Sequence, residues 1–98
     1  MAKYRPLPDY LTIKESNIEG LGLFTTEKVE SDLNLGVTHI VDPQTKELIR
    51  TPLGGFVNHS EQPNAKLHYV GNRRYLIPLR DLEADEEITL KYSMYDPT

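Results

Sequence analysis

The sequence predicts a mainly β domain. Apolar side chains alternate with polar ones in several short runs, as they do in half-buried strands, and no segment keeps an apolar period of 3.6 residues. The chain of 98 residues contains seven prolines and six glycines, which favours many turns between short strands. Its length corresponds to a single domain covering residues 1–98.

The first half of the chain predicts three strands after an extended arm. Residues 1–8 form the arm, because Pro6 and Pro8 disfavour a helix there. The expected strands are residues 10–14, 23–24 and 33–41. In the third, one face collects the alternating residues Leu33, Leu35, Val37, His39 and Val41. The residues from Asp42 to Lys46 are typical of a turn, and residues 47–50 are too short to classify.

The second half predicts a β-hairpin and a closing strand. Residues 65–69 and 73–79 alternate on either side of Gly71-Asn72, the usual pattern of a hairpin. The second run has a face made by Tyr75, Ile77 and Leu79. Residues 81–87 carry five carboxylates and form a short turn or helical bend. The last strand has an inward face made by Ile88, Leu90 and Tyr92, and a short tail of residues 93–98 follows.

Composition excludes several classes of protein. The chain has no cysteine, so neither disulfides nor a thiolate zinc cluster can stabilise it. No stretch approaches the ~20 apolar residues of a membrane span. A formal net charge of −4 argues against nucleic acid as a direct partner and favours basic partners such as Lys-rich peptides. We therefore expect a soluble intracellular protein.

The stretch from Gly54 to Asn64 has the most unusual composition. Two glycines and a short apolar pair precede five consecutive polar residues, and Pro63 excludes a helix over the segment. One interpretation is a plain connector, in which Asn58 and Asn64 make side-chain-to-backbone turns. The other is a buried functional loop, whose donors and acceptors must all find partners.

Three separated pieces of the chain resemble, in the right order, the motifs of SET domains. The run Glu19-Gly20-Leu21-Gly22-Leu23-Phe24 is similar to their Gly-x-Gly motif. The run Asn58-His59-Ser60-Glu61-Gln62-Pro63-Asn64 resembles their Asn-His-Ser-x-x-Pro-Asn motif. The run from Leu82 to Tyr92 resembles their closing segment, which ends in the catalytic tyrosine. Together the three pieces extend over most of the chain.

The resemblance implies a fold and an activity. The fold is a SET-domain, β-clip-like arrangement of short curved sheets with a C-terminal pseudoknot, which brings the second and third motifs together. The activity is transfer of a methyl group from S-adenosylmethionine (SAM) to a lysine of a protein substrate, leaving S-adenosylhomocysteine and using no metal. The resemblance places the cofactor against Glu19, Gly20, Leu21, Gly22, Asn58 and His59. The resemblance also implies that Tyr92 is the catalytic residue.

Other features of the resemblance concern the substrate. Tyr95 and Leu67 are the candidate substrate-binding residues, and Leu67 occupies a position where many relatives place an aromatic channel residue. The cysteine-rich zinc lid of many relatives is missing, and the insert that builds the peptide groove is short. The architecture is most similar to the short stand-alone SET proteins of viruses, some of which form homodimers. A homodimer is therefore a hypothesis here, as is a nuclear location if the substrate is a histone.

Two alternatives stay open at the level of the sequence. The chain could be a non-catalytic SET-like module that binds a peptide or a partner protein, or a structural dimer. His59 could also be a metal ligand together with His39 and His68, although their spacing is unlike that of known metal sites. For Tyr92, the alternative to catalysis is a structural hydrogen bond from its buried hydroxyl to a backbone carbonyl.

Overall fold

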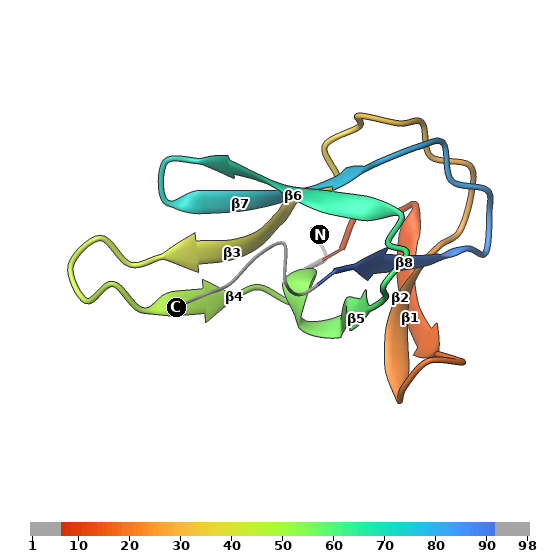
Figure 1. The fold of residues 1–98 in the computed structure, drawn as a ribbon, viewed down its shortest axis with the longest axis horizontal. Coiled ribbons are helices and arrows are strands. Elements are labelled where there is room, and N and C mark those ends of the chain that lie inside the picture. Colours follow the sequence, from red (N-terminus) through yellow and green to blue (C-terminus); the bar gives the residue numbers. More distant parts are fainter. Residues whose placement is uncertain (1–6, 92–98) are drawn as a thin grey trace, which may run out of the picture.

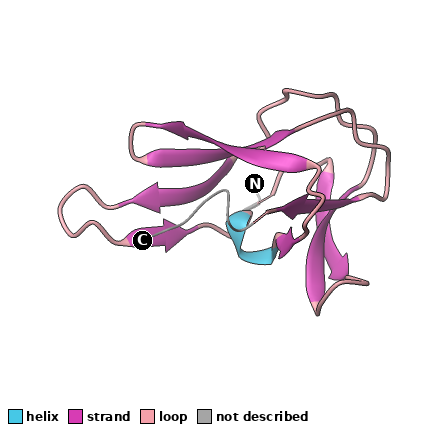
Figure 2. Cartoon of the chain, viewed as in Figure 1, coloured by secondary structure: helices cyan, strands magenta, loops and turns pink. Residues whose placement is uncertain are grey.

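In the computed structural model, which describes residues 7–91, the chain forms two four-stranded sheets and one short helical turn (Figures 1 and 2). The first sheet has the order β1 (Leu11–Glu15), β2 (Leu21–Thr25), β8 (Glu87–Leu90) and β5 (Asn58–His59). The second has the order β4 (Leu48–Arg50), β3 (Val37–Val41), β7 (Arg73–Pro78) and β6 (Ala65–Val70). The predicted β class is confirmed.

The last strand lies inside the first sheet. β8 pairs antiparallel with β2, opposite Leu23, and parallel with β5, where Asn58 is opposite Thr89. In Figure 1 the dark blue β8 accordingly lies beside the orange β2 and the green segment that carries β5. The closing strand thus joins the N-terminal hairpin to the central stretch, as the resemblance implied.

The predicted hairpin is confirmed, and residues on both faces of its second strand are buried. β6 and β7 pair from Ala65 opposite Pro78 to Val70 opposite Arg73, with Gly71 at a φ of +58° in the turn. Leu76 of β7 is fully buried in the core, and Ile77 on the other face is also buried, whereas Leu79 lies beyond the strand and is exposed. Local alternation defines two faces of a strand, but neighbouring elements decide which of them is covered.

The predicted strand over residues 33–41 is shorter than expected. β3 begins at Val37, and Leu33 is exposed. Gly36 has a φ of +128° and its N–H is bound by the Asn34 side chain, which interrupts the extended backbone. The pairing with β7 then shifts between Val37 and His39, a bulge-like irregularity, so two successive residues, Thr38 and His39, are both buried.

The central stretch contains a helical turn that the proline rule missed. A 3₁₀ helix, η1, covers Gly54–Phe56 and ends well before Pro63. It packs closely on β3: a Cβ added at Gly54 would lie 2.4 Å from the backbone oxygen of Thr38. Pro63 restricts only itself and the residue before it, so its effect does not reach the start of the stretch.

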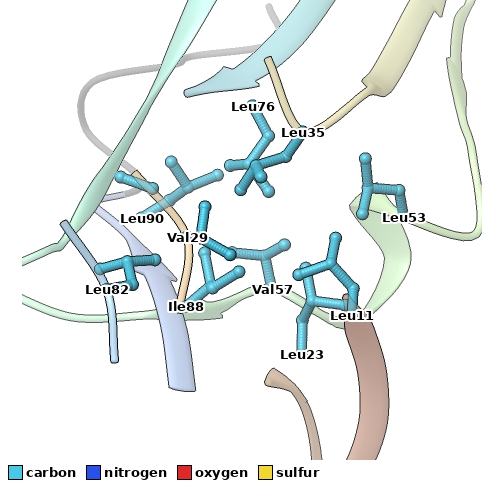
Figure 3. Close-up of a cluster of buried hydrophobic side chains, with 11 residues drawn as sticks. Leu11, Leu23, Val29, Leu35, Leu53, Val57, Leu76, Leu82, Ile88 and Leu90 are labelled. Atoms are coloured by element: carbon cyan, nitrogen blue, oxygen red, sulfur yellow. The ribbon is translucent and has the colours of Figure 1, made fainter. Parts of the chain in front are cut away.

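The hydrophobic core lies between the two sheets and draws on loops as well as strands (Figure 3). Strands of the first sheet contribute Leu11, Leu23, Ile88 and Leu90, and the second sheet contributes Ala65 and Leu76. Loop residues complete the cluster: Val29, Leu35, Leu53, Val57 and Leu82. Each fully buried leucine stabilises the fold by roughly 1.5–3 kcal/mol relative to an exposed one. Within the described residues, no helix is long and apolar enough to cross a membrane.

Candidate cofactor and substrate site

The Asn58 side chain connects the two segments that the sequence assigned to the cofactor. Its amide nitrogen lies 3.1 Å from the backbone oxygen of Glu19 and 3.3 Å from that of Leu21. The same nitrogen lies 2.8 Å from a carboxylate oxygen of Glu87 in β8. An amide that donates to both segments holds the Glu19–Gly22 loop against the central stretch, which argues against the plain-connector interpretation of Asn58.

A carboxylate from the closing segment completes this junction. The Ser16 hydroxyl lies 2.8 Å from each carboxylate oxygen of Glu87, and it also accepts a hydrogen bond from the N–H of Ile18 at 2.9 Å. Ser16 therefore fixes the tight turn between β1 and β2, and Glu87 fixes Ser16. Charge-assisted hydrogen bonds of this kind are stronger than neutral ones.

Sequence reasoning missed both Ser16 and Glu87. Ser16 lies in a polar turn and Glu87 in a run of carboxylates, so neither stands out by pattern. The available signal was Gly22, whose lack of a side chain needed an explanation. A Cβ there would lie 2.2 Å from a carboxylate oxygen of Glu87, so this glycine makes room for the carboxylate.

Gly20 has a different role from Gly22. Its φ is +47°, which favours glycine, and nothing lies within 4 Å of where its Cβ would be. Gly20 closes the turn through a hydrogen bond from the N–H of Ser16 to its carbonyl at 2.8 Å. The first glycine therefore shapes the loop, and the second allows the loop to pack on β8.

Part of this junction is exposed to solvent. Glu19, Gly20 and Leu21 are all exposed, so a ligand can reach the backbone of the loop. The Asn58 amide nitrogen is engaged by the protein, whereas no described residue donates a hydrogen bond to its side-chain oxygen. This oxygen is therefore an acceptor that a ligand's donor group can use.

Asn64, the last residue of the second motif, clamps the closing strand. Its side-chain oxygen accepts a hydrogen bond from the N–H of Thr89 at 2.8 Å, and its side-chain nitrogen donates to the carbonyl of Glu87 at 2.7 Å. Both partners are backbone groups of β8. The N–H of Ser60 adds a bond to the carbonyl of Leu90 at 2.9 Å. The second motif thus binds the backbone of the closing segment through two of its residues, Ser60 and Asn64.

His59 lies at the edge of this junction with its ring half-buried. Its Nε2 atom lies 3.4 Å from a carboxylate oxygen of Glu61. The His59 hydrogen bond, together with the nearby Lys91 ammonium, holds the pKa of the Glu61 carboxyl below its usual range. The described residues contain no group of three or more histidine, cysteine, aspartate or glutamate side chains suited to a metal ion. The pairing of His39 with Arg74, and of His68 with Tyr75, places these two histidines on opposite faces of the second sheet.

The predicted substrate residues are only partly within the described chain. Leu67 is half-buried, lies opposite Leu76 in the β6–β7 hairpin and packs against the core. Tyr92 and Tyr95 lie outside the described residues, which end at Lys91, one residue beyond β8.

The fold and the junction of three motifs define a SET domain. The SET domain family model matches residues 37–93, more than half of the chain, and the chain therefore belongs to this family. A search of curated proteins found no match.

Solved structures agree with this assignment at the level of the fold. A candidate histone methyltransferase from Plasmodium falciparum is similar with a TM-score of 0.70 and 21% identity, covering 88% of this chain and 99% of that chain. The methyltransferase domain of human PR domain-containing protein 2 has a TM-score of 0.70 and 15% identity, covering 85% of this chain and 76% of that chain.

Proposed function

We propose that this protein transfers a methyl group from SAM to the side chain of a lysine in a protein substrate. The observation that carries the proposal is the Asn58 amide, which joins the Glu19–Gly22 loop to Glu87 of the closing segment. Family membership supports methyl transfer as the class of reaction. The neighbouring methyltransferase structures support a protein substrate, since one of them is described as acting on histones.

The protein residues would bind and orient the cofactor. Glu19, Gly20 and Leu21 offer exposed backbone on one side, with the buried Gly22 behind them, and Asn58 and His59 border it on the other. Bound SAM would supply the electrophilic methyl group. No metal is needed, since the reaction requires alignment of the lysine nitrogen with that group. Positioning of this kind can lower a barrier by up to ~7–11 kcal/mol.

The lysine must be neutral to react. Its ordinary pKa of about 10.4 keeps it protonated at neutral pH, so the site has to lower that value by removing water from the amine or by placing a cation nearby. We assign Leu67 and Tyr95 to the walls of the lysine channel, and Tyr92 to orientation of the amine. Leu67 is apolar and half-buried, as a desolvating wall requires.

The test measures cofactor binding first and transfer second. Isothermal titration with SAM is expected to give saturable binding, and radiolabelled SAM is expected to label lysine in a panel of Lys-containing proteins. Asn58→Ala should weaken SAM binding because the loop loses its tie, whereas Asn17→Ala, at an exposed neighbour of the same loop, should not. Absence of SAM binding at millimolar concentration would refute the proposal. Binding without transfer would support a non-catalytic module instead.

Dimerisation is a separate part of the proposal. The resemblance to short viral SET proteins supports a homodimer, and sedimentation equilibrium measures it directly. A monomer at all accessible concentrations would remove the dimer and leave the site residues of this chain to act alone.

A further inference from the structure

The longest sheet edge in the described part of the chain is formed by β6. The two sheets end in the edge strands β1 and β5, and β4 and β6. β6 has six residues, whereas β1 has five, β4 has three and β5 has two. Figure 1 shows β6 at the outer margin of the second sheet, beside β7. A long open edge presents backbone groups that can pair with another chain.

The hydrogen bonds of β7 determine which backbone groups of β6 face this edge. The N–H of Leu76 binds the carbonyl of Gly36 at 2.9 Å, so Leu76 directs its backbone groups toward the β3 side of β7. Leu67 lies opposite Leu76 and therefore directs its own groups away from β7. The alternation along β6 gives Ala65 and Tyr69 the same orientation.

Two of these three outward residues are accessible. Ala65 is fully buried, so a partner cannot reach it, whereas Leu67 is half-buried and Tyr69 is 49% exposed. Within residues 7–91, the outward N–H and C=O groups of Leu67 and Tyr69 have no hydrogen-bond partner. Val70, the next residue, is 51% exposed. The edge therefore combines unpaired backbone groups with exposed apolar side chains, as edges that pair with another strand do.

A second copy of β6 satisfies these groups in one register. When two β6 strands pair antiparallel about a two-fold axis perpendicular to the sheet, Leu67 of each lies opposite Tyr69 of the other, with His68 at the axis. All outward groups of Leu67 and Tyr69 are then hydrogen-bonded. Centring the contact on Leu67 would place Tyr69 opposite the buried Ala65. Centring it on Tyr69 would place Leu67 opposite Gly71, which has a φ of +58° in the turn.

The same register also matches the side chains. On the face that continues from the core, Leu67 of each copy meets Tyr69 of the other, and aromatic–apolar pairs of this kind stabilise sheets. On the opposite face Lys66 meets Val70, so lysine does not lie opposite lysine. The Tyr69 ring is already held by Arg74, whose guanidinium carbon lies 4.7 Å from the ring centroid. A ring held in this way loses little conformational freedom when it packs on a partner.

We propose that two copies of this chain pair through their β6 edges, with His68 at the two-fold axis, and join their second sheets into one continuous sheet. The inference rests on the homodimer of the proposed function and adds its interface and register. The second copy then places Tyr69 beside Leu67, the residue assigned to the wall of the lysine channel. An edge contact buries less surface than a standard interface, so we expect a Kd in the micromolar range or weaker.

Cysteine cross-linking tests this register directly, because the chain has no cysteine of its own. His68→Cys places two thiols at the axis, in a pair whose Cα atoms are about 4.5 Å apart and thus within the ~4.4–6.8 Å range of a disulfide. With a mild oxidant and a protein concentration at or above the Kd, most of this variant should migrate as a covalent dimer on a non-reducing gel.

Two further cysteine variants are matched controls. In Tyr69→Cys the thiols lie diagonally across the contact, about 7–8 Å apart or more, which is beyond the reach of a disulfide. In Ile49→Cys the thiol replaces a side chain that is 48% exposed on β4, the opposite edge of the same sheet. Both should cross-link at least about fivefold more slowly than His68→Cys.

Lysine substitutions test the same edge without cross-linking. Tyr69→Lys should weaken association at least about tenfold in sedimentation equilibrium, because it removes an apolar contact and places a charge on the edge. Ile49→Lys adds the same charge at a similarly exposed position on the other edge and should change association less than about twofold. Melting curves measured by circular dichroism establish that the compared variants are folded.

Three results would overturn the proposal. These are equal cross-linking of the three cysteine variants, a dimer that Tyr69→Lys leaves unchanged, and a monomer at all accessible concentrations. A sedimentation dimer that His68→Cys does not cross-link would retain the homodimer and assign it to another surface. Neither experiment contains SAM or a substrate, so failure of this interface is distinguishable from failure of methyl transfer.

Discussion

Gly22 and Glu87 form a complementary pair at the scale of single residues. The glycine leaves space for a carboxylate that receives hydrogen bonds from Ser16 and Asn58. Each residue alone has an ordinary explanation, since a glycine near a turn and a glutamate near a strand end are both common. Their contact, with the Ser16 Cβ also 3.1 Å from an added Cβ, explains why a side chain cannot be added at Gly22.

This pair predicts a non-additive effect on stability. Gly22→Ala should destabilise the domain by about 1–3 kcal/mol, because its methyl group displaces the Glu87 carboxylate from Ser16 and Asn58. In a Glu87→Ala background the same substitution should cost much less, since the space is then free. Urea unfolding of both single variants and the double variant measures the coupling.

Gly20→Ala is the control for this cycle. Its cost arises from the positive φ of +47°, and no atom lies near the added methyl group. It should therefore destabilise the domain equally with and without Glu87. If Gly22→Ala were also equal in both backgrounds, the steric explanation of Gly22 would be wrong.

Tyr92 carries the second prediction at this scale. Tyr92→Phe removes one hydroxyl and retains the ring, so it should cost on the order of 1 kcal/mol in stability. Methyl transfer should fall much further, because a group that acts mainly in the transition state affects rate more than binding. Turnover is measured per folded molecule, alongside the melting temperature.

The structural alternative for Tyr92 gives the opposite pattern. A hydroxyl that only bonds a backbone carbonyl would show a clear loss of stability with nearly unchanged turnover. SAM affinity serves as the control, and it should stay within about twofold of the parent protein if the hydroxyl acts in the chemical step.

At the scale of elements, β8 depends on side chains from the central stretch. It is a short strand, Glu87–Leu90, between the two-residue strand β5 and the end of β2. Backbone pairing with β5 covers only two residues, and Asn64 supplements it with two hydrogen bonds to the β8 backbone. The position of the closing segment is thus set by a loop residue as much as by strand pairing.

Asn64→Ala should therefore loosen β8 specifically. It leaves the N–H of Thr89 and the carbonyl of Glu87 without their partner, at a cost of roughly 1–3 kcal/mol. Hydrogen exchange at the Thr89 amide should accelerate more than exchange in the β6–β7 hairpin. Asn72→Ala, which removes one exposed bond to the carbonyl of Val41, is the matched control and should leave the Thr89 amide protected.

At the scale of the whole molecule, His39 links stability to pH. Its pKa falls from 6.5 to about 4 in the folded protein, because burial and the charges of Arg74 and Arg50 disfavour the protonated ring. The unfolded chain therefore binds a proton more readily between these values. The contribution of His39 is fully present above about pH 6.5 and is lost as the pH falls through about 4.

Denaturant unfolding as a function of pH measures this link. The free energy of unfolding should rise between pH 4 and pH 6.5, and His39→Gln should flatten the rise. His68→Gln, on the opposite face of the same sheet, is the control and should retain the parent slope. An unchanged slope in His39→Gln would assign the pH dependence to other groups.

The sequence by itself determined the class, the motifs and most strand positions. Alternation is a local property, so the hairpin around Gly71 and the strand at Ile88 were readable without the structure. The motif pieces were readable for a similar reason, because their residue types and order are unusual. They correctly predicted that the central stretch meets the closing segment.

The tertiary structure decided which groups meet and which faces are covered. Ser16 and Glu87 are 71 positions apart, and no local pattern connects a turn serine to one of five neighbouring carboxylates. The irregular pairing of β3 buries Thr38 beside His39, against the alternation. Such features depend on how separate elements dock, and a periodic pattern along one element carries no information about its neighbour.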